Sequence, residues 1–120
     1  KIIHIPYFFS KADVLFLSLK DNNIFRKTVP AKIQSYLASG KPILGMISGE
    51  TQSIIKRSGG GFVSESSDFI DLSNYVKKFM NLSDEELKMM SENNIKFYNE
   101  NFSFLKRKNS LIDIIKRYCF

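Results

Sequence analysis

A short basic segment has the residue types of an anion-binding site. Arg26 and Lys27 come directly before the segment TVPAK, which runs from Thr28 to Lys32 at the start of a predicted helix. The free N–H groups of a first helical turn, together with the helix dipole, attract negative charge. A lysine is locally unfavourable beside that positive end, so Lys32 favours a bound anion there. A threonine-capped helix with three solvated basic side chains is the alternative.

Other familiar chemistry is absent from the sequence. It contains neither a glycine-lysine phosphate loop nor the pattern Gly-x-Gly-x-x-Gly. With a single histidine, His4, and a single cysteine, Cys119, a zinc site of nitrogen and sulfur ligands is nearly excluded. We therefore predict no metal and no cofactor. A lone cysteine also favours a reducing compartment.

The elements that must position this segment alternate between strands and helices. Residues 14–19 and 42–47 are continuous apolar runs, which are typical of strands buried on both faces of a parallel sheet. Residues 20–27 between them are predicted as a loop, followed by a helix from about Thr28. That helix has Pro30 in its first turn, an apolar stripe, and Gly40 as a left-handed cap.

The second half of the chain continues the pattern. We predict a helix over residues 50–56, stopped by three glycines, and a short strand at residues 62–63. Asp68 is predicted to cap the next helix, and Ser83 with Glu86 forms a capping box for another. A last helix opens at Ser103, and we expect it to bury five apolar side chains. These are Leu105, Leu111, Ile112, Ile115 and Tyr118.

This order predicts one α/β domain of Rossmann-like type, with about three parallel strands, right-handed crossovers and flanking helices. A length of 120 residues leaves little room for a second domain, and 43% hydrophobic residues suffice for a core. Ligands of such sheets bind at the carboxyl ends of the strands. The loops at residues 20–27, 48–51 and 64–67 are expected there.

The charge distribution favours an anionic partner. The formal net charge is +6, and residues 20–57 hold seven basic residues against Asp21 and Glu50. A second basic cluster follows Ser103. Nucleotide phosphates, anionic lipid headgroups and nucleic acid all fit such a field.

The segment at residues 25–44, FRKTVPAKIQSYLASGKPIL, resembles the donor-binding segment of GT-B glycosyltransferases of family 4. It has Thr-x-Pro-x-Lys before Tyr-x-Ala-x-Gly-x-Pro, as in bacterial aminosugar transferases, including those for fucosamine. Residues 12–15, 59–63 and 101–103 match the family's pattern in order, so the resemblance covers nearly the whole chain.

The resemblance implies a nucleotide-sugar donor whose diphosphate binds the backbone amides of Thr28 and Val29, assisted by Lys32. Arg26 and Lys27 are candidate phosphate neighbours. Positive groups would stabilise the leaving nucleoside diphosphate without a tightly bound metal.

Three further residues are candidates for contact with the donor ribose or sugar: Ser35, Gly49 and Glu50. The family often has two glutamates eight residues apart, and those positions fall here on Lys27 and Ser35. The carboxylate that usually contacts the ribose can accept two hydrogen bonds, and Ser35 has only a hydroxyl at that position.

The resemblance also implies that residues 1–120 are part of a C-terminal donor-binding domain, without the N-terminal domain that binds a glycan or lipid-linked acceptor. The expected activity is a retaining, hexosyltransferase-type reaction in bacterial surface polysaccharide synthesis, with this chain inactive alone. The expected location is the cytoplasm, with peripheral attachment at the inner face of the cytoplasmic membrane. The strand between Val14 and Leu19 would be an exposed apolar edge, through which we expect self-association.

Two other classes of function stay open. A non-catalytic basic α/β module could bind nucleic acid, although basic and aromatic residues do not interleave on one exposed strand face, so we expect no nucleic acid. A pure oligomerisation domain is the third interpretation. Binding of uridine diphosphate by wild type and Lys32→Ala separates them.

Overall fold

The chain forms a three-stranded parallel sheet with helices around it. The computed structural model describes residues 4–119. The strands are β1 (Leu15–Ser18), β2 (Ile43–Met46) and β3 (Gly61–Ser64), in the order β1-β2-β3, and both neighbouring pairs are parallel. This confirms the predicted α/β fold of Rossmann-like type.

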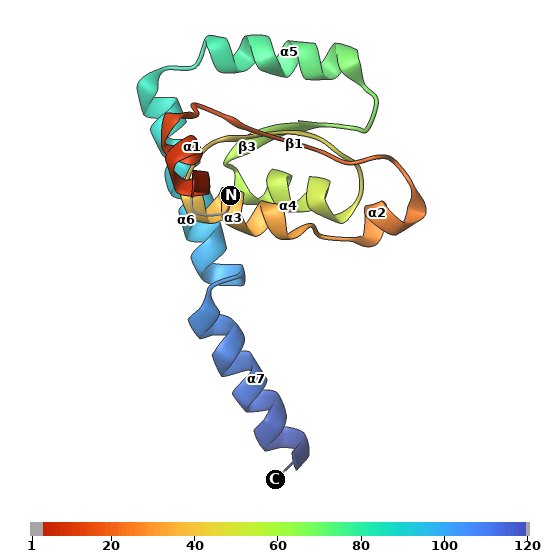
Figure 1. The fold of residues 1–120 in the computed structure, drawn as a ribbon, viewed down its shortest axis with the longest axis vertical. Helices are drawn as coiled ribbons and strands as arrows, with labels where there is room; N and C mark the ends of the chain where they lie inside the picture. The colour runs from red at the N-terminus through yellow and green to blue at the C-terminus, as the bar shows by residue number, and fades with distance from the viewer. Residues whose placement is uncertain (1–3, 120) are drawn as a thin grey trace.

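The described residues also form seven helices. They are α1 (Ile5–Lys11), α2 (Asn23–Lys27), α3 (Ala31–Ser39), α4 (Glu50–Ser58), α5 (Phe69–Met80), α6 (Asp84–Asn101) and α7 (Phe104–Cys119). Helices α3 and α4 cover one face of the sheet and α5 lies over the other, while α7 projects away from the body (Figure 1). The molecule is accordingly elongated, with extents of 55 × 33 × 30 Å.

The hydrophobic core lies between the sheet and the helices α3 and α4. Its buried members are Leu17, Ile33, Leu37, Ile43, Ile47, Ile54, Ile55 and Val63. Ile33 and Leu37 are fully buried, which confirms the predicted apolar stripe of α3. Gly40 ends that helix with a φ of 72°, as the sequence predicts.

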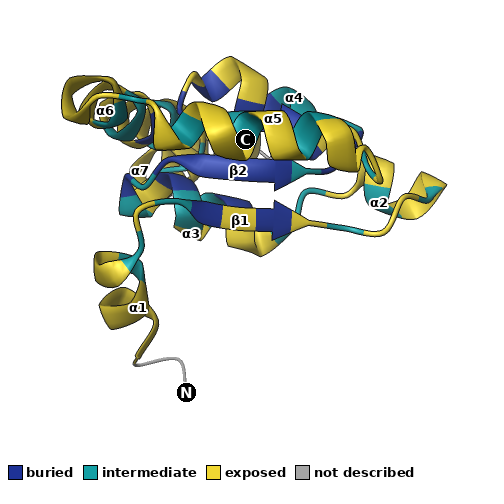
Figure 2. Ribbon diagram, turned by 90° about the horizontal axis from the view of Figure 1, so that it is seen from above, coloured by how far each residue is buried: buried dark blue, intermediate teal, exposed yellow. Residues whose placement is uncertain are grey.

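The prediction that the apolar runs at residues 14–19 and 42–47 are both buried on both faces is wrong for the first, which forms β1. Leu15 and Leu17 face the core, but Phe16 is 48% exposed (Figure 2). The reason is that α5 covers only β2 and β3, where Tyr75 stacks on Phe62 with ring centroids 5.2 Å apart. β1 is therefore an edge strand with one face open. Its outward Phe16 carbonyl accepts a hydrogen bond of 3.2 Å from the Tyr36 hydroxyl.

The predicted start of the helix at Thr28 is also wrong. Residues 20–27 are not all loop, because Asn22 caps the short helix α2 by accepting a hydrogen bond from the Phe25 amide at 2.8 Å. Thr28 is the C-cap of α2, and α3 begins only at Ala31, with Pro30 as its N-cap. A helix cap at Asn22 therefore moves the following helix three residues along the chain.

Helix α6 crosses the amino end of the sheet. It begins with the predicted capping box, in which Ser83 and Glu86 exchange hydrogen bonds of 3.2 and 2.8 Å. Farther along, the fully buried Asn94 donates to the carbonyls of Lys41 and Gly60, both at 2.9 Å. These carbonyls precede β2 and β3, so one side chain fixes α6 to the start of two strands.

The prediction that the last helix buries its apolar side chains is wrong. All five of them, Leu105, Leu111, Ile112, Ile115 and Tyr118, are between 37% and 77% exposed. Helix α7 follows α6 and extends away from the sheet, so its apolar side chains do not pack against the hydrophobic core (Figure 1). No helix in the described part of the chain has the length and apolar content needed to cross a bilayer.

Candidate anion-binding site at the carboxyl end of the sheet

Hydrogen bonds connect the three loops that follow the strands. The buried Thr51 in the first turn of α4 donates a hydrogen bond of 3.3 Å to the Thr28 carbonyl. The Ser66 amide, after β3, donates to the Ser48 hydroxyl, after β2, at 3.1 Å. These contacts bring the predicted segment at Thr28 beside the loop that carries Gly49.

Gly49 allows the closest of these approaches. Its φ is 91°, and a Cβ built on it would lie 2.2–2.7 Å from backbone atoms of Arg26. A side chain at this position would therefore displace α2. The predicted candidates Arg26 and Gly49 thus lie next to each other, through backbone atoms of α2 and not through the guanidinium group.

Two helices start at this end of the sheet without a side-chain cap. The cap residues are Pro30 for α3 and Gly49 for α4, and neither offers a side-chain acceptor. The first amides of a helix have no partner within the helix, so those of Ala31 and Lys32 remain available to an outside acceptor. Two uncapped helix termini on one edge of a parallel sheet provide a positive electrostatic field for an anion.

Thr28 lies differently from the prediction. Its amide donates to the Phe25 carbonyl at 3.3 Å and its hydroxyl donates to the Ile24 carbonyl at 2.7 Å. Both groups are therefore engaged by the C-terminus of α2. Val29 next to it packs its side chain against the core. The assignment of both amides to a diphosphate site stays a prediction, and for Thr28 it requires that its hydrogen bond to Phe25 break.

Arg26 forms an ion pair with Asp21 on the solvent side of the site. Its Nε and Nη2 atoms donate to the two carboxylate oxygens at 2.6 and 2.8 Å. This two-bond contact lowers the pKa of Asp21 and raises that of Arg26, to which the charge of Glu65 also contributes. Arg26 is therefore partly neutralised as a phosphate neighbour.

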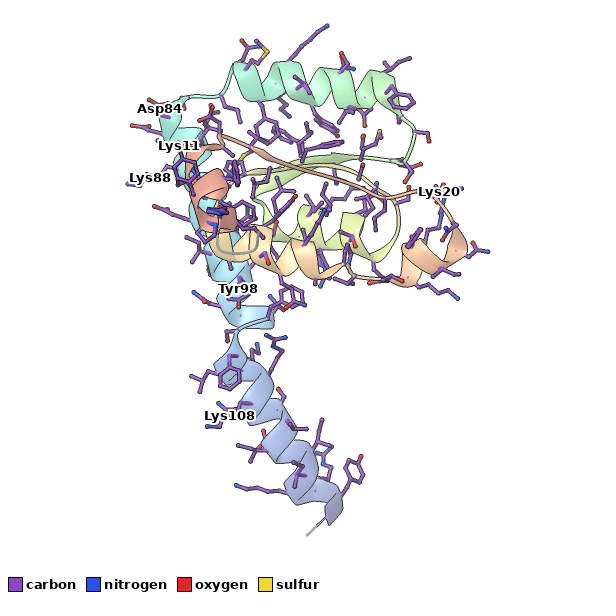
Figure 3. All side chains as sticks on the ribbon, in the orientation of Figure 1. Lys11, Lys20, Asp84, Lys88, Tyr98 and Lys108 are labelled. Carbon is purple, nitrogen blue, oxygen red and sulfur yellow. The ribbon has the colours of Figure 1, made fainter. Side chains whose placement is uncertain are left out.

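The remaining basic candidates are open to solvent. Lys27 ends α2 and Lys32 lies in the first turn of α3, and both are exposed. In Figure 3, the labelled Lys20 lies on the α2 side of the sheet, whereas Lys11 and Lys88 lie at the opposite side. Glu50 is exposed at the first position of α4, where its charge suits the helix dipole without any ligand.

Ser35 is not brought to the same place as Glu50 by any contact of the structure. It is exposed on α3 and lines a mostly apolar groove of about 600 Å³ between α1 and α3, together with Ile5, Pro6 and Phe9. A role for Ser35 in contacting the donor ribose stays a prediction.

Sequence reasoning placed Asp21, Ser48 and Thr51 in the loops at this edge but did not predict their contacts. Asp21 pairs with Arg26 across the short helix α2, whose Asn22 cap was the available signal. Ser48 and Thr51 act through partners 18 and 23 residues away, and no local pattern reveals such a partner. In residues 4–119, no group of three or more His, Cys, Asp or Glu side chains could hold a metal ion.

Comparison with protein-family models, with curated protein sequences and with solved structures found no match. The resemblance to GT-B glycosyltransferases therefore depends on the residues quoted for it, and it stays a prediction.

Proposed function

We propose that this chain supplies part of the donor diphosphate site of a bacterial glycosyltransferase that uses a nucleotide sugar. The observation that carries the proposal is the pair of uncapped helix termini, α3 at Pro30 and α4 at Gly49, on the carboxyl edge of the sheet. Thr28, Pro30 and Lys32, the first part of the motif on which the resemblance depends, lie at the same edge. Nothing in this arrangement depends on a particular sugar or base.

In the proposed complex, the diphosphate lies over the first turn of α3. The amides of Ala31 and Lys32 donate to its oxygens, and the Lys32 and Lys27 ammonium groups neutralise its charge. As the bond to the sugar breaks, negative charge grows on the leaving diphosphate. Fixed donors and cations then stabilise the transition state more than the bound donor, which is the requirement for catalysis.

The acceptor and the rest of the donor site belong to parts outside this chain in the proposal. We expect a glycan or lipid-linked acceptor bound by an N-terminal domain, and no turnover by residues 1–120 alone. A cytoplasmic enzyme attached peripherally at the inner face of the cytoplasmic membrane would meet both a nucleotide sugar and a lipid-linked acceptor.

Titration of the labelled chain with uridine diphosphate, followed by amide chemical shifts, tests the proposal. We expect weak, saturable binding, with the largest shifts at Ala31, Lys32 and Glu50. Lys32→Ala should weaken binding about tenfold, because it removes one charge-assisted contact. Lys88→Ala on α6 is the matched control and should bind like wild type.

Two results would contradict the proposal. The first is the absence of diphosphate binding in a correctly folded chain, and the second is equal binding by the Lys32 and Lys88 variants. Salt-sensitive binding of single-stranded nucleic acid without diphosphate binding would favour the basic binding module instead.

A further inference from the structure

Helix α7 carries an apolar stripe that the rest of the chain does not cover. Phe104, Leu111 and Tyr118 recur at intervals of seven residues, and Ile115 lies one turn after Leu111, which places them on one side of the helix. Leu105, Ile112 and Ile114 widen this stripe. All of these side chains are exposed, with Ile112 the least exposed at 37%.

The same helix is strongly basic. It holds five basic side chains, Lys106, Arg107, Lys108, Lys116 and Arg117, against the single acidic Asp113. One of the five, Arg107, reaches back to Gln34 of α3 at 3.4 Å. All five are exposed, so the charge is available to an outside partner.

These two properties together select a class of partner. A helix that combines a marked apolar stripe, many Lys and Arg residues and low net hydrophobicity is typical of helices that lie in a lipid–water interface. Lys108 and Arg107 lie toward the apolar side, but their long stems let the charged ends reach the headgroups. A protein partner would need its own acidic surface, whereas an anionic bilayer supplies both apolar depth and negative charge.

The arrangement of the helix also suits a flat surface. Helix α7 extends away from the sheet as the longest projection of the molecule, so the globular part does not block its sides (Figures 1 and 3). Its 16 residues span about 24 Å in the plane of such a surface.

We propose that α7 binds the surface of an anionic lipid bilayer, with its apolar stripe at the acyl boundary and its basic side chains on the headgroups. The helix lies in the interface and does not cross it. This inference does not rest on sugar transfer, because it uses only the sequence and exposure of α7.

Flotation of the full chain with vesicles tests the proposal. We expect binding to phosphatidylcholine vesicles that contain phosphatidylglycerol, and much weaker binding to phosphatidylcholine alone or at high salt. Leu111→Asp with Ile115→Asp should weaken binding at least about tenfold by removing the apolar contact. Lys116→Glu with Arg117→Glu should weaken it to a similar extent by reversing two charges.

A matched control keeps the overall charge change and moves it elsewhere. Lys56→Glu with Lys77→Glu alters basic residues in the last turns of α4 and α5, as Lys116 and Arg117 lie in the last turn of α7. This variant should bind vesicles more tightly than the α7 charge variant. Circular dichroism checks that all variants remain folded.

Three outcomes would overturn the proposal. One is the absence of vesicle binding by wild type. Another is an equal loss of vesicle binding in the α7 charge variant, Lys116→Glu with Arg117→Glu, and in the control variant. The third is a dimer in sedimentation without lipid that the Leu111 and Ile115 substitutions dissociate, because a second copy would then cover the stripe.

Discussion

Helices α6 and α7 follow one another in the chain, yet only α6 belongs to the folded body. They have similar lengths, 18 and 16 residues. Helix α7 has the more regular apolar stripe, but none of its residues from Phe104 to Tyr118 is buried. Helix α6 is mostly polar, but it contacts the body through the fully buried Asn94 and through Phe97 and Tyr98, which pack against the core. An apolar stripe shows that a helix needs a partner, whereas contacts with the rest of the chain decide whether it has one.

The anchor of α6 is polar and specific. The two Nδ2 hydrogen bonds of Asn94 end on the carbonyls of Lys41 and Gly60, and Gly60 also accepts from the Ile43 amide at 3.0 Å. Within the described residues, the Asn94 Oδ1 atom has no hydrogen-bond partner. The side chain thus serves as a double donor that satisfies two carbonyls at the amino end of the sheet.

The largest effect is expected from Gly60→Ala. A Cβ at position 60 would lie 1.8 Å from the Oδ1 atom of Asn94, so either α6 or the start of β3 must move. We expect a loss of about 3 kcal/mol in the free energy of unfolding, measured by urea denaturation. Gly59→Ala is the control, where the new Cβ would meet only Asn93, at 3.3 Å, and strain at a φ of 69° costs about 1 kcal/mol.

The clash with Asn94 makes these effects non-additive. In Gly60→Ala with Asn94→Ala, the obstructing amide is gone, so the double variant should be more stable than the sum of the two losses predicts. Additive losses would show that α6 is not anchored at this point.

Asn94→Ala should give the next largest effect. It removes one buried and one partly buried hydrogen bond and leaves the Lys41 carbonyl without this donor, so we expect a loss of about 2 kcal/mol in the free energy of unfolding. Asn93→Ala is an unusually close control, because Asn93 donates to the adjacent Gly59 carbonyl at 3.0 Å from an exposed position. Its loss should be about 0.5 kcal/mol. Equal losses in chemical denaturation would contradict the role of burial.

The part of the fold that the sequence predicts correctly is determined by neighbours in the chain. The capping box at Ser83 and the left-handed cap at Gly40 depend on residues within one helical turn. The continuous apolar run of β2 reflects its central position between two parallel strands. The α/β fold class follows from such local signals taken in order.

The errors have a different physical origin. Asn94 acts on carbonyls 53 and 34 residues away, which no periodicity reveals. The stripe of α7 has the same pattern whether or not a core lies beneath it, so its exposure could not be predicted from spacing. Phe16 is exposed because α5 does not reach β1, a property of the whole arrangement. In the candidate site, the helix cap at Asn22 creates α2, so α3 begins at Ala31 and not at Thr28 as predicted. The hydrogen bond from Thr51 to the Thr28 carbonyl joins residues 23 apart in the chain, which no local pattern reveals.

Two serine caps give a smaller and more direct test of the comparison. Ser83 accepts a hydrogen bond from the Glu86 amide at the start of α6, and Ser103 accepts one from the Lys106 amide at the start of α7, at 3.2 and 3.3 Å. Ser83→Ala should lower the free energy of unfolding by about 1 kcal/mol. Ser103→Ala should leave it almost unchanged and should only increase amide hydrogen exchange within α7, because α7 can fray without opening the core. A similar global loss from both substitutions would mean that α7 unfolds together with the body.

Helix α2 is an intermediate case, and its ion pair gives the smallest expected effect. It has no buried residue, like α7, but its backbone contacts Gly49 of the body, as α6 contacts its strands. Since Arg26 lowers the pKa of Asp21 in the folded state, the pair contributes stability above the unfolded pKa of about 3.9 and loses it as pH falls through the folded pKa.

Arg26→Ala should therefore return the Asp21 carboxyl to an ordinary pKa in a titration followed by NMR. The substitution should lower the free energy of unfolding slightly near neutral pH. This difference should disappear as pH falls through the lowered pKa of Asp21 in the wild-type fold, below which the carboxyl is protonated in both proteins. If backbone contact and not charge fixes α2, hydrogen exchange of its amides should change little in this variant. Fast amide hydrogen exchange throughout α2 would instead show that α2, like α7, can unfold without opening the rest of the chain.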